Sequence, residues 1–176
     1  MKRLWTLLIL SGIVAASPIS LPDHFKADFK QRITNPDKKV IHYKGTVRFS
    51  DAKMLKWVYR EPTEKEVCSN GANVTVVDHD LEQVSYYLIE KGFDLAEILK
   101  SAKPYKKTKT VFIAKYEGRN YTIQLDAKQR LWRVAYYDDL DNEVLIIFEK
   151  MRYGKGKLPL KSLLCEAPES YDVIGE

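Results

Sequence analysis

Apolar and polar residues alternate with a period of two along most of the chain, which is the pattern of β-strands that bury one face. Phe25, Ala27 and Phe29 share one face of a first strand, and Val47 and Phe49 share one face of a second. Further strands are expected over 55–59, 67–68, 74–77, 83–89, 111–116, 121–125, 131–137 and 144–151. The connections are short turns with too few residues for crossover helices. The pattern therefore predicts a mainly β domain built as an antiparallel meander.

One stretch has helical spacing instead. Leu95, Ile98 and Leu99 recur on one side of a predicted helix over 94–102, and Lys103-Pro104 ends it. A short helix with a narrow apolar face suits a lid across one side of a sheet. The apolar segment 158–164 is expected to form a helical turn that leads into a last short strand around Cys165.

Residues 1–16 have the pattern of a cleavable signal peptide. Lys2 and Arg3 precede an apolar run that is short for a membrane span, and the small residues 14–16 predict cleavage before Ser17. No cysteine follows the predicted cut, so a lipid-modified mature protein is not expected. We predict a single mature domain over 17–176, exported across the inner membrane. An uncleaved membrane anchor is the alternative.

The charge and the cysteines narrow the picture further. Removal of Lys2 and Arg3 leaves 27 basic and 24 acidic residues, a balance too mild to indicate a nucleic-acid partner. In an oxidising compartment Cys68 and Cys165 can form a disulfide that closes a loop of about 100 residues. Two separate buried thiols are the other interpretation.

The sequence offers little catalytic chemistry. It has three histidines and none of the common metal, nucleophile or phosphate-loop motifs. Asp78-His79-Asp80 and the acidic run 138–142 fall between predicted strands, where polar turns are expected. The lysine run 103–109 suits either a solvated linker or a contact with anionic lipid or an acidic partner. We therefore predict a binding protein, not an enzyme, with no cofactor and no metal. Periodicity leaves open whether its interior is a packed core or an apolar cavity.

Several short motifs follow one another in an order that resembles the LolA family of periplasmic lipoprotein carriers. They are Phe25-x-Ala27-x-Phe29-x-Gln31, Gly45-x-Val47-x-Phe49, Leu55-x-Trp57-x-Tyr59-x-x-Pro62, Ser69-Asn70-Gly71, Asp78-x-x-Leu81-x-Gln83, the helix from Leu95 to Leu99, the strand from Tyr121 to Leu125, and Pro168-x-x-Tyr171-Asp172-Val173. Each motif is weak alone, but together they span nearly the whole mature chain.

The resemblance implies an open, incomplete antiparallel β-barrel whose helical lid covers a hydrophobic cavity. It also implies a carrier that binds the acyl chains of lipoproteins released from the inner membrane and delivers them to the outer membrane. The residues that the resemblance places at the acyl chains are Val47, Phe49, Leu55, Trp57, Tyr59, Leu95, Ile98 and Leu99. The implied partners are an inner-membrane transporter of the ATP-binding-cassette type and an outer-membrane lipoprotein receptor or the membrane itself, with the carrier as a monomer. A lipid-sensing regulatory module of the same fold is the alternative function.

The sequence departs from the family's pattern at two places. An Arg-Pro pair that precedes the Leu-x-Trp strand in the family, and whose arginine is associated with lid closure, is replaced here by Asp51-Ala52. Arg48 or Lys53 are the candidate substitutes. The family's first helix also has no counterpart, because residues 17–24 contain Pro18 and Pro22. We therefore expect a different control of the lid and a more open cavity.

Overall fold

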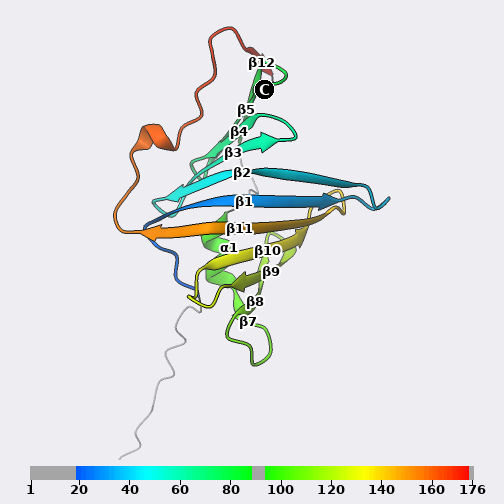
Figure 1. Ribbon diagram of the computed structural model, residues 1–176, viewed down its shortest axis with the longest axis vertical. Coiled ribbons are helices and arrows are strands. Elements are labelled where there is room, and N and C mark those ends of the chain that lie inside the picture. Colours follow the sequence, from blue (N-terminus) through cyan, green and yellow to red (C-terminus); the bar gives the residue numbers. More distant parts are fainter. Residues whose placement is uncertain (1–18, 89–93, 175–176) are drawn as a thin grey trace, which may run out of the picture.

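A computed structural model describes residues 19–88 and 94–174. In these ranges twelve strands form one sheet in the order β12-β6-β5-β4-β3-β2-β1-β11-β10-β9-β8-β7 (Figure 1). The edge strands β12 and β7 do not pair with each other, so the sheet is open. The strands are β1 His24–Thr34, β2 Val40–Ser50, β3 Met54–Glu61, β4 Lys65–Ser69, β5 Asn73–Asp78, β6 Gln83–Leu88, β7 Lys103–Pro104, β8 Val111–Tyr116, β9 Arg119–Leu125, β10 Leu131–Tyr137, β11 Glu143–Gly154 and β12 Asp172–Ile174. The helices are α1 Leu95–Ser101 and the 3-10 turn η1 Leu160–Ser162. The predicted mainly β class and the open sheet are confirmed.

The sheet consists of two meanders joined through its longest strands. Neighbouring strands pair in sequence order from β1 to β6 and from β7 to β11, and the antiparallel pairing of β1 with β11 unites the two halves. The antiparallel prediction holds for every pair except the last, because β12 lies parallel to β6, with Asp172 opposite Gln83. The 17 residues between β11 and β12 carry the chain to the edge of the sheet beside β6.

Alternation divides the sheet into two faces, which we call inner and outer. Phe25, Ala27 and Phe29 are buried on the inner face of β1, while Lys26 and Lys30, which have the opposite parity, are exposed. The register places Phe29 opposite Gly45 of β2, and Gly45 opposite Tyr59 of β3. A Cβ at Gly45 would lie 1.9 Å from the carbonyl oxygen of Val58 and 2.8 Å from the Phe29 ring. Glycine therefore lets the aromatic ring lie directly on the backbone of β2.

Helix α1 covers part of the inner face and lies behind β10 and β11 in Figure 1. The Asp94 side chain caps its first turn by accepting a hydrogen bond from the Glu97 amide at 3.0 Å. Leu95, Ile98 and Leu99 are buried, which confirms the predicted helix and its apolar side. Lys103-Pro104 ends the helix as expected, but these residues also form the short edge strand β7 beside β8.

The segment after β11 crosses the outer face near β2 to β4 and ends at β12 (Figure 1, orange to red). Leu163, just after η1, is 2% exposed, and Cys165 is bonded to Cys68 of β4. The predicted helical turn is therefore confirmed. The predicted strand around Cys165 is wrong, because the backbone there is held by the disulfide and by side chains of the outer face. The last strand begins seven residues later, at Asp172.

Two expectations fall on residues that the structure does not describe. They are the signal peptide predicted at 1–16 and Ile89 at the end of the strand predicted over 83–89. Residues 19–23, which precede β1, contain no helix. Within the described ranges, no helix has the length and apolar character needed to span a bilayer.

Candidate functional site

Aromatic rings cover the centre of the inner face, side by side across β1, β2, β3 and β11. Phe25 stacks on Phe49 with ring centroids 5.0 Å apart, and Phe29 meets Trp57 edge to face at 4.8 Å. Phe148 of β11 joins both pairs, at 6.4 Å from Phe25 and 6.0 Å from Trp57. These separations are those of favourable aromatic pairs. The centre of the inner face is thus an apolar surface of packed aromatic rings.

The structure brings the eight predicted acyl-binding residues to this face. All belong to or pack against one apolar cluster: Val47, Phe49, Leu55, Trp57, Tyr59, Leu95, Ile98 and Leu99. Seven are buried, with Trp57 the most exposed of them at 8%, and Tyr59 is partly buried. The side chains of α1 therefore lie against the same apolar cluster as the sheet residues.

Three members of this face were not among the predicted site residues. Phe25, Phe29 and Phe148 are at most 3% exposed and make the ring contacts described above. For Phe25 and Phe29 the signal was present, because they alternate with charged residues on β1. Phe148 lies in a nearly continuous apolar strand, where alternation gives no parity.

Tyrosines occupy another part of the inner surface. The Tyr59 ring lies 5.1 Å from Phe29 and 5.6 Å from Tyr43. Burial raises the pKa of the Tyr59 hydroxyl above its ordinary range, with smaller contributions from Tyr136 and Tyr43. Burial likewise raises the pKa of Tyr136 to about 12, helped by Tyr121 and Asp138. These phenols remain neutral at physiological pH, so this part of the face is polar but uncharged.

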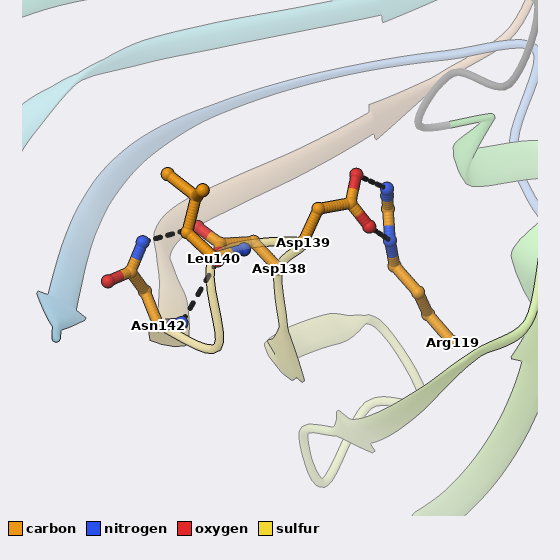
Figure 2. A network of polar contacts seen from close by, with 5 residues as sticks. All are labelled: Arg119, Asp138, Asp139, Leu140 and Asn142. Carbon is orange, nitrogen blue, oxygen red and sulfur yellow. Dashed lines mark hydrogen bonds and ion pairs between the residues drawn. The ribbon is translucent and has the colours of Figure 1, made fainter. Parts of the chain in front are cut away.

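The turn between β10 and β11, which begins two residues after Tyr136, is held by polar contacts (Figure 2). Asp138 accepts hydrogen bonds from the backbone amides of Leu140 and Asn142 at 2.9 and 3.0 Å and from the Asn142 side chain. Arg119 of β9 donates to both carboxylate oxygens of Asp139 and so ties two hairpins together. Hydrogen bonding to Asp139 raises the pKa of Arg119. The acidic run 138–142 is therefore a structural turn.

The position that departs from the family's pattern lies at the β2–β3 turn. Asp51 forms an ion pair with Lys157 of the C-terminal segment at 2.8 Å. A pocket of about 400 Å³ lies beside it, lined by Leu21, Pro22, Phe49 and Ala52 among others. Arg48 points to the outer face, where it donates to the carbonyl oxygen of Ser162 at 3.0 Å. Arg48 therefore holds the C-terminal segment and does not reach the lid helix.

One cluster on the outer face combines potential metal ligands. Glu66, Cys68 and Cys165 come within 4.8 Å of one another, but both sulfurs are consumed by the disulfide and Glu66 is ion-paired with Lys56 at 2.8 Å. His79, in the Asp78-His79-Asp80 run, contacts the Tyr171 hydroxyl at 3.1 Å. These groups are engaged in holding the fold together.

An open sheet whose apolar inner face lies under a short helix is an arrangement suited to binding a hydrophobic ligand. Comparison with known proteins agrees: residues 22–100 match the family described as outer membrane lipoprotein carrier protein LolA. The chain is 32% identical over 150 residues to the outer-membrane lipoprotein carrier protein of Campylobacter jejuni, with 85% of each chain covered. It is 28% identical over 147 residues to the protein of the same name from Wolinella succinogenes, with 84% of each covered. The chain belongs to the LolA family.

A solved structure shows the same fold. The chain superposes on an uncharacterized conserved protein from Thermus thermophilus with a TM-score of 0.53, covering 88% of this chain and 91% of that one. Sequence identity between the two is 10%, so this likeness concerns the fold alone.

Proposed function

We propose that this protein carries lipoproteins through the periplasm by burying their acyl chains against the inner face, without catalysing a reaction. The proposal depends on one observation: the apolar side chains of α1 belong to the same buried cluster as the aromatic rings of the sheet. The only α-helix in the described ranges lies against the apolar side of the sheet, in a family whose members are named lipoprotein carriers. Proposed partners are an inner-membrane transporter that loads the carrier and an outer-membrane receptor or membrane that unloads it.

The energetics allow an acyl chain to replace the helix. Each buried aliphatic side chain contributes about 1.5–3 kcal/mol, so Leu95, Ile98 and Leu99 together contribute roughly 5–9 kcal/mol. A methylene group contributes about 0.8 kcal/mol when buried, so roughly six to eleven methylenes offset the loss of these three contacts. Part of one acyl chain is enough. A closed empty state and an open loaded state then lie close in free energy, and a carrier that must later release its cargo needs this balance.

The apolar character of the exchanged surface supports the same mechanism. Leu55, Trp57 and Phe49 belong to the apolar cluster, and the side-chain hydrogen bonds of α1 within the described ranges stay inside the helix and its cap. Moving α1 out of the cluster therefore breaks none of these bonds. At the β2–β3 turn, Asp51-Ala52 supplies no arginine, and Asp51 binds Lys157 instead. We propose that apolar contacts, and not a lid arginine, hold the helix closed.

The first test is to purify the mature protein from the periplasm and identify bound material by mass spectrometry. Acylated peptides or lipids, in about equimolar amount, are expected. Empty protein from cells that are sorting lipoproteins would overturn the proposal.

The second test uses Leu55→Glu, which places a charge on the inner face. We expect release of a lipoprotein from spheroplasts to be lost, while far-ultraviolet circular dichroism stays unchanged. Leu140→Glu is the matched control, because Leu140 is 76% exposed in the β10–β11 turn. Normal release by a folded Leu55→Glu protein contradicts the site assignment.

A further inference from the structure

The hairpin that follows α1 carries a concentration of positive charge that the proposed acyl-chain site does not use. Residues 98–116 contain six lysines and no aspartate or glutamate. Five of them form no ion pair with any carboxylate in the described ranges: Lys103, Lys106, Lys107, Lys109 and Lys115. Elsewhere on the sheet, lysines such as Lys30, Lys44 and Lys150 are paired with carboxylates at 2.7–2.8 Å.

The hairpin turn is ordered by hydrogen bonds and is not a solvated linker. Tyr105 donates its amide to the carbonyl oxygen of Val111 at 2.9 Å, and the Thr108 hydroxyl bonds the carbonyl oxygens of both Tyr105 and Val111. The lysines on this turn are therefore held close together on a defined backbone. Figure 1 shows the β7–β8 loop projecting at the end of the sheet opposite β12.

Aromatic and aliphatic side chains lie among the lysines. Lys103, Lys106 and Lys115 border a groove of about 550 Å³ whose remaining wall includes Pro104, Tyr105 and Ile113. Tyr105 is 45% exposed, and the Lys106 ammonium lies 5.1 Å from the centre of its ring. Lysine heads above tyrosine and aliphatic groups are typical of surfaces that lie in a lipid headgroup region, because such side chains have an apolar body and a polar tip.

The neighbouring strand adds no competing negative charge. Asn120, Thr122 and Gln124 of β9 lie opposite Lys115, Ile113 and Val111 of β8. Asp126, which follows β9, is ion-paired with Arg130 at 2.7 Å and accepts its backbone amide. The surface therefore complements a dense array of anions.

We propose that the β7–β8 hairpin docks the protein on membranes that contain anionic phospholipids. The lysines contact the lipid phosphates, and Tyr105 enters the headgroup region. Because Ser101 ends α1 and Lys103 begins β7, docking takes place one residue from the lid helix. This surface is separate from the proposed acyl-chain site, so membrane docking does not depend on the proposed carriage of lipoproteins.

The test is flotation of the full mature protein with vesicles of phosphatidylethanolamine containing about 30% phosphatidylglycerol, and with vesicles of phosphatidylcholine alone. We expect binding to the anionic vesicles only, weakening steeply between about 0.05 and 0.3 M salt. The variant with Lys103, Lys106, Lys107 and Lys109 all changed to Gln should bind at least about 100-fold more weakly. Tyr105→Ala should weaken binding several-fold.

The matched control changes four exposed lysines elsewhere, Lys26, Lys39, Lys155 and Lys161, to Gln, so that net charge falls equally. It should keep most of the vesicle binding. Equal losses in both variants, equal binding to phosphatidylcholine, or no binding to either vesicle would overturn the proposal. Binding to an acidic polypeptide such as polyglutamate but not to anionic vesicles would assign the surface to an acidic protein partner and also overturn it. Because no lipoprotein is present, these outcomes are separate from those that test lipoprotein carriage.

Discussion

The two faces of the sheet are covered in opposite ways. On the inner face, α1 packs through its apolar side chains into the apolar cluster that also contains the aromatic rings. On the outer face, the C-terminal segment is held by directional and covalent links: Arg48 and Lys56 donate to the carbonyl oxygens of Ser162 and Leu164, and Cys68 is bonded to Cys165. Apolar contacts can be exchanged for a hydrophobic ligand, whereas polar and covalent links fix one arrangement. We therefore expect the α1 cover to move and the C-terminal cover to stay in place.

The largest expected effect comes from removing a ring on the inner face. Phe29 contacts both Trp57 and Tyr59 and is 1% exposed, so Phe29→Ala should lower the free energy of unfolding by about 3–5 kcal/mol. Urea denaturation measures the loss. Lys30→Ala, on the opposite face of the same strand, should cost less than about 1 kcal/mol. Similar losses for the two would mean that the inner face does not dominate stability.

The covalent link on the outer face can be removed without touching the inner one. The double variant Cys68→Ser and Cys165→Ser opens a link between residues 97 positions apart and should lower stability by about 2–5 kcal/mol. Lipid binding at the inner face should persist in the folded protein. Loss of lipid binding at a temperature where the variant remains folded would argue against independent faces.

The polar link on the outer face gives a sharper contrast. Lys56 is buried, pairs with Glu66 and donates to the Leu164 carbonyl, both at 2.8 Å. Lys56→Ala leaves the partly buried Glu66 carboxylate without its partner and should cost about 3 kcal/mol. Lys44→Ala, which breaks the exposed pair with Glu61, should cost at most about 1 kcal/mol. Thermal denaturation of the two variants side by side tests the contrast.

The smallest effect concerns the inner tyrosines at high pH. Tyr136 has a pKa of about 12 in the folded protein against 10.0 for a free phenol, so the unfolded chain loses this proton first. The free energy of unfolding keeps its full contribution from Tyr136 below pH 10. It falls by roughly 2–3 kcal/mol as the pH rises towards 12. Tyr136→Phe should flatten the decline of stability over this range. An unchanged slope would contradict the burial of this hydroxyl.

Much of this molecule could be predicted from local pattern. The parity of Phe25, Val47 and Trp57 identified the buried face, because a strand buried on one side must alternate. The capped helix at 95–101 followed from its apolar spacing and the proline after it. The order of weak motifs indicated the family, which the similarity to the Campylobacter jejuni protein then showed.

Other features depend on contacts between distant residues. The pairing of β1 with β11, the parallel position of β12 and the route of the C-terminal segment join positions that are roughly 90 to 130 residues apart, and no local pattern encodes such separations. Arg48 illustrates the limit: its parity between Val47 and Phe49 already directs it to the outer face, but only the fold shows that it binds the Ser162 carbonyl there.

For the alternating strands the sequence alone therefore determined which residues face inward, since a period of two is set by the backbone of a single strand. The tertiary structure decided what covers each face. Only the fold places Leu95, Ile98 and Leu99 with the aromatic rings and Cys165 beside Cys68. Each covering segment is far in sequence from strands that it packs against, so these contacts form only when the whole sheet assembles.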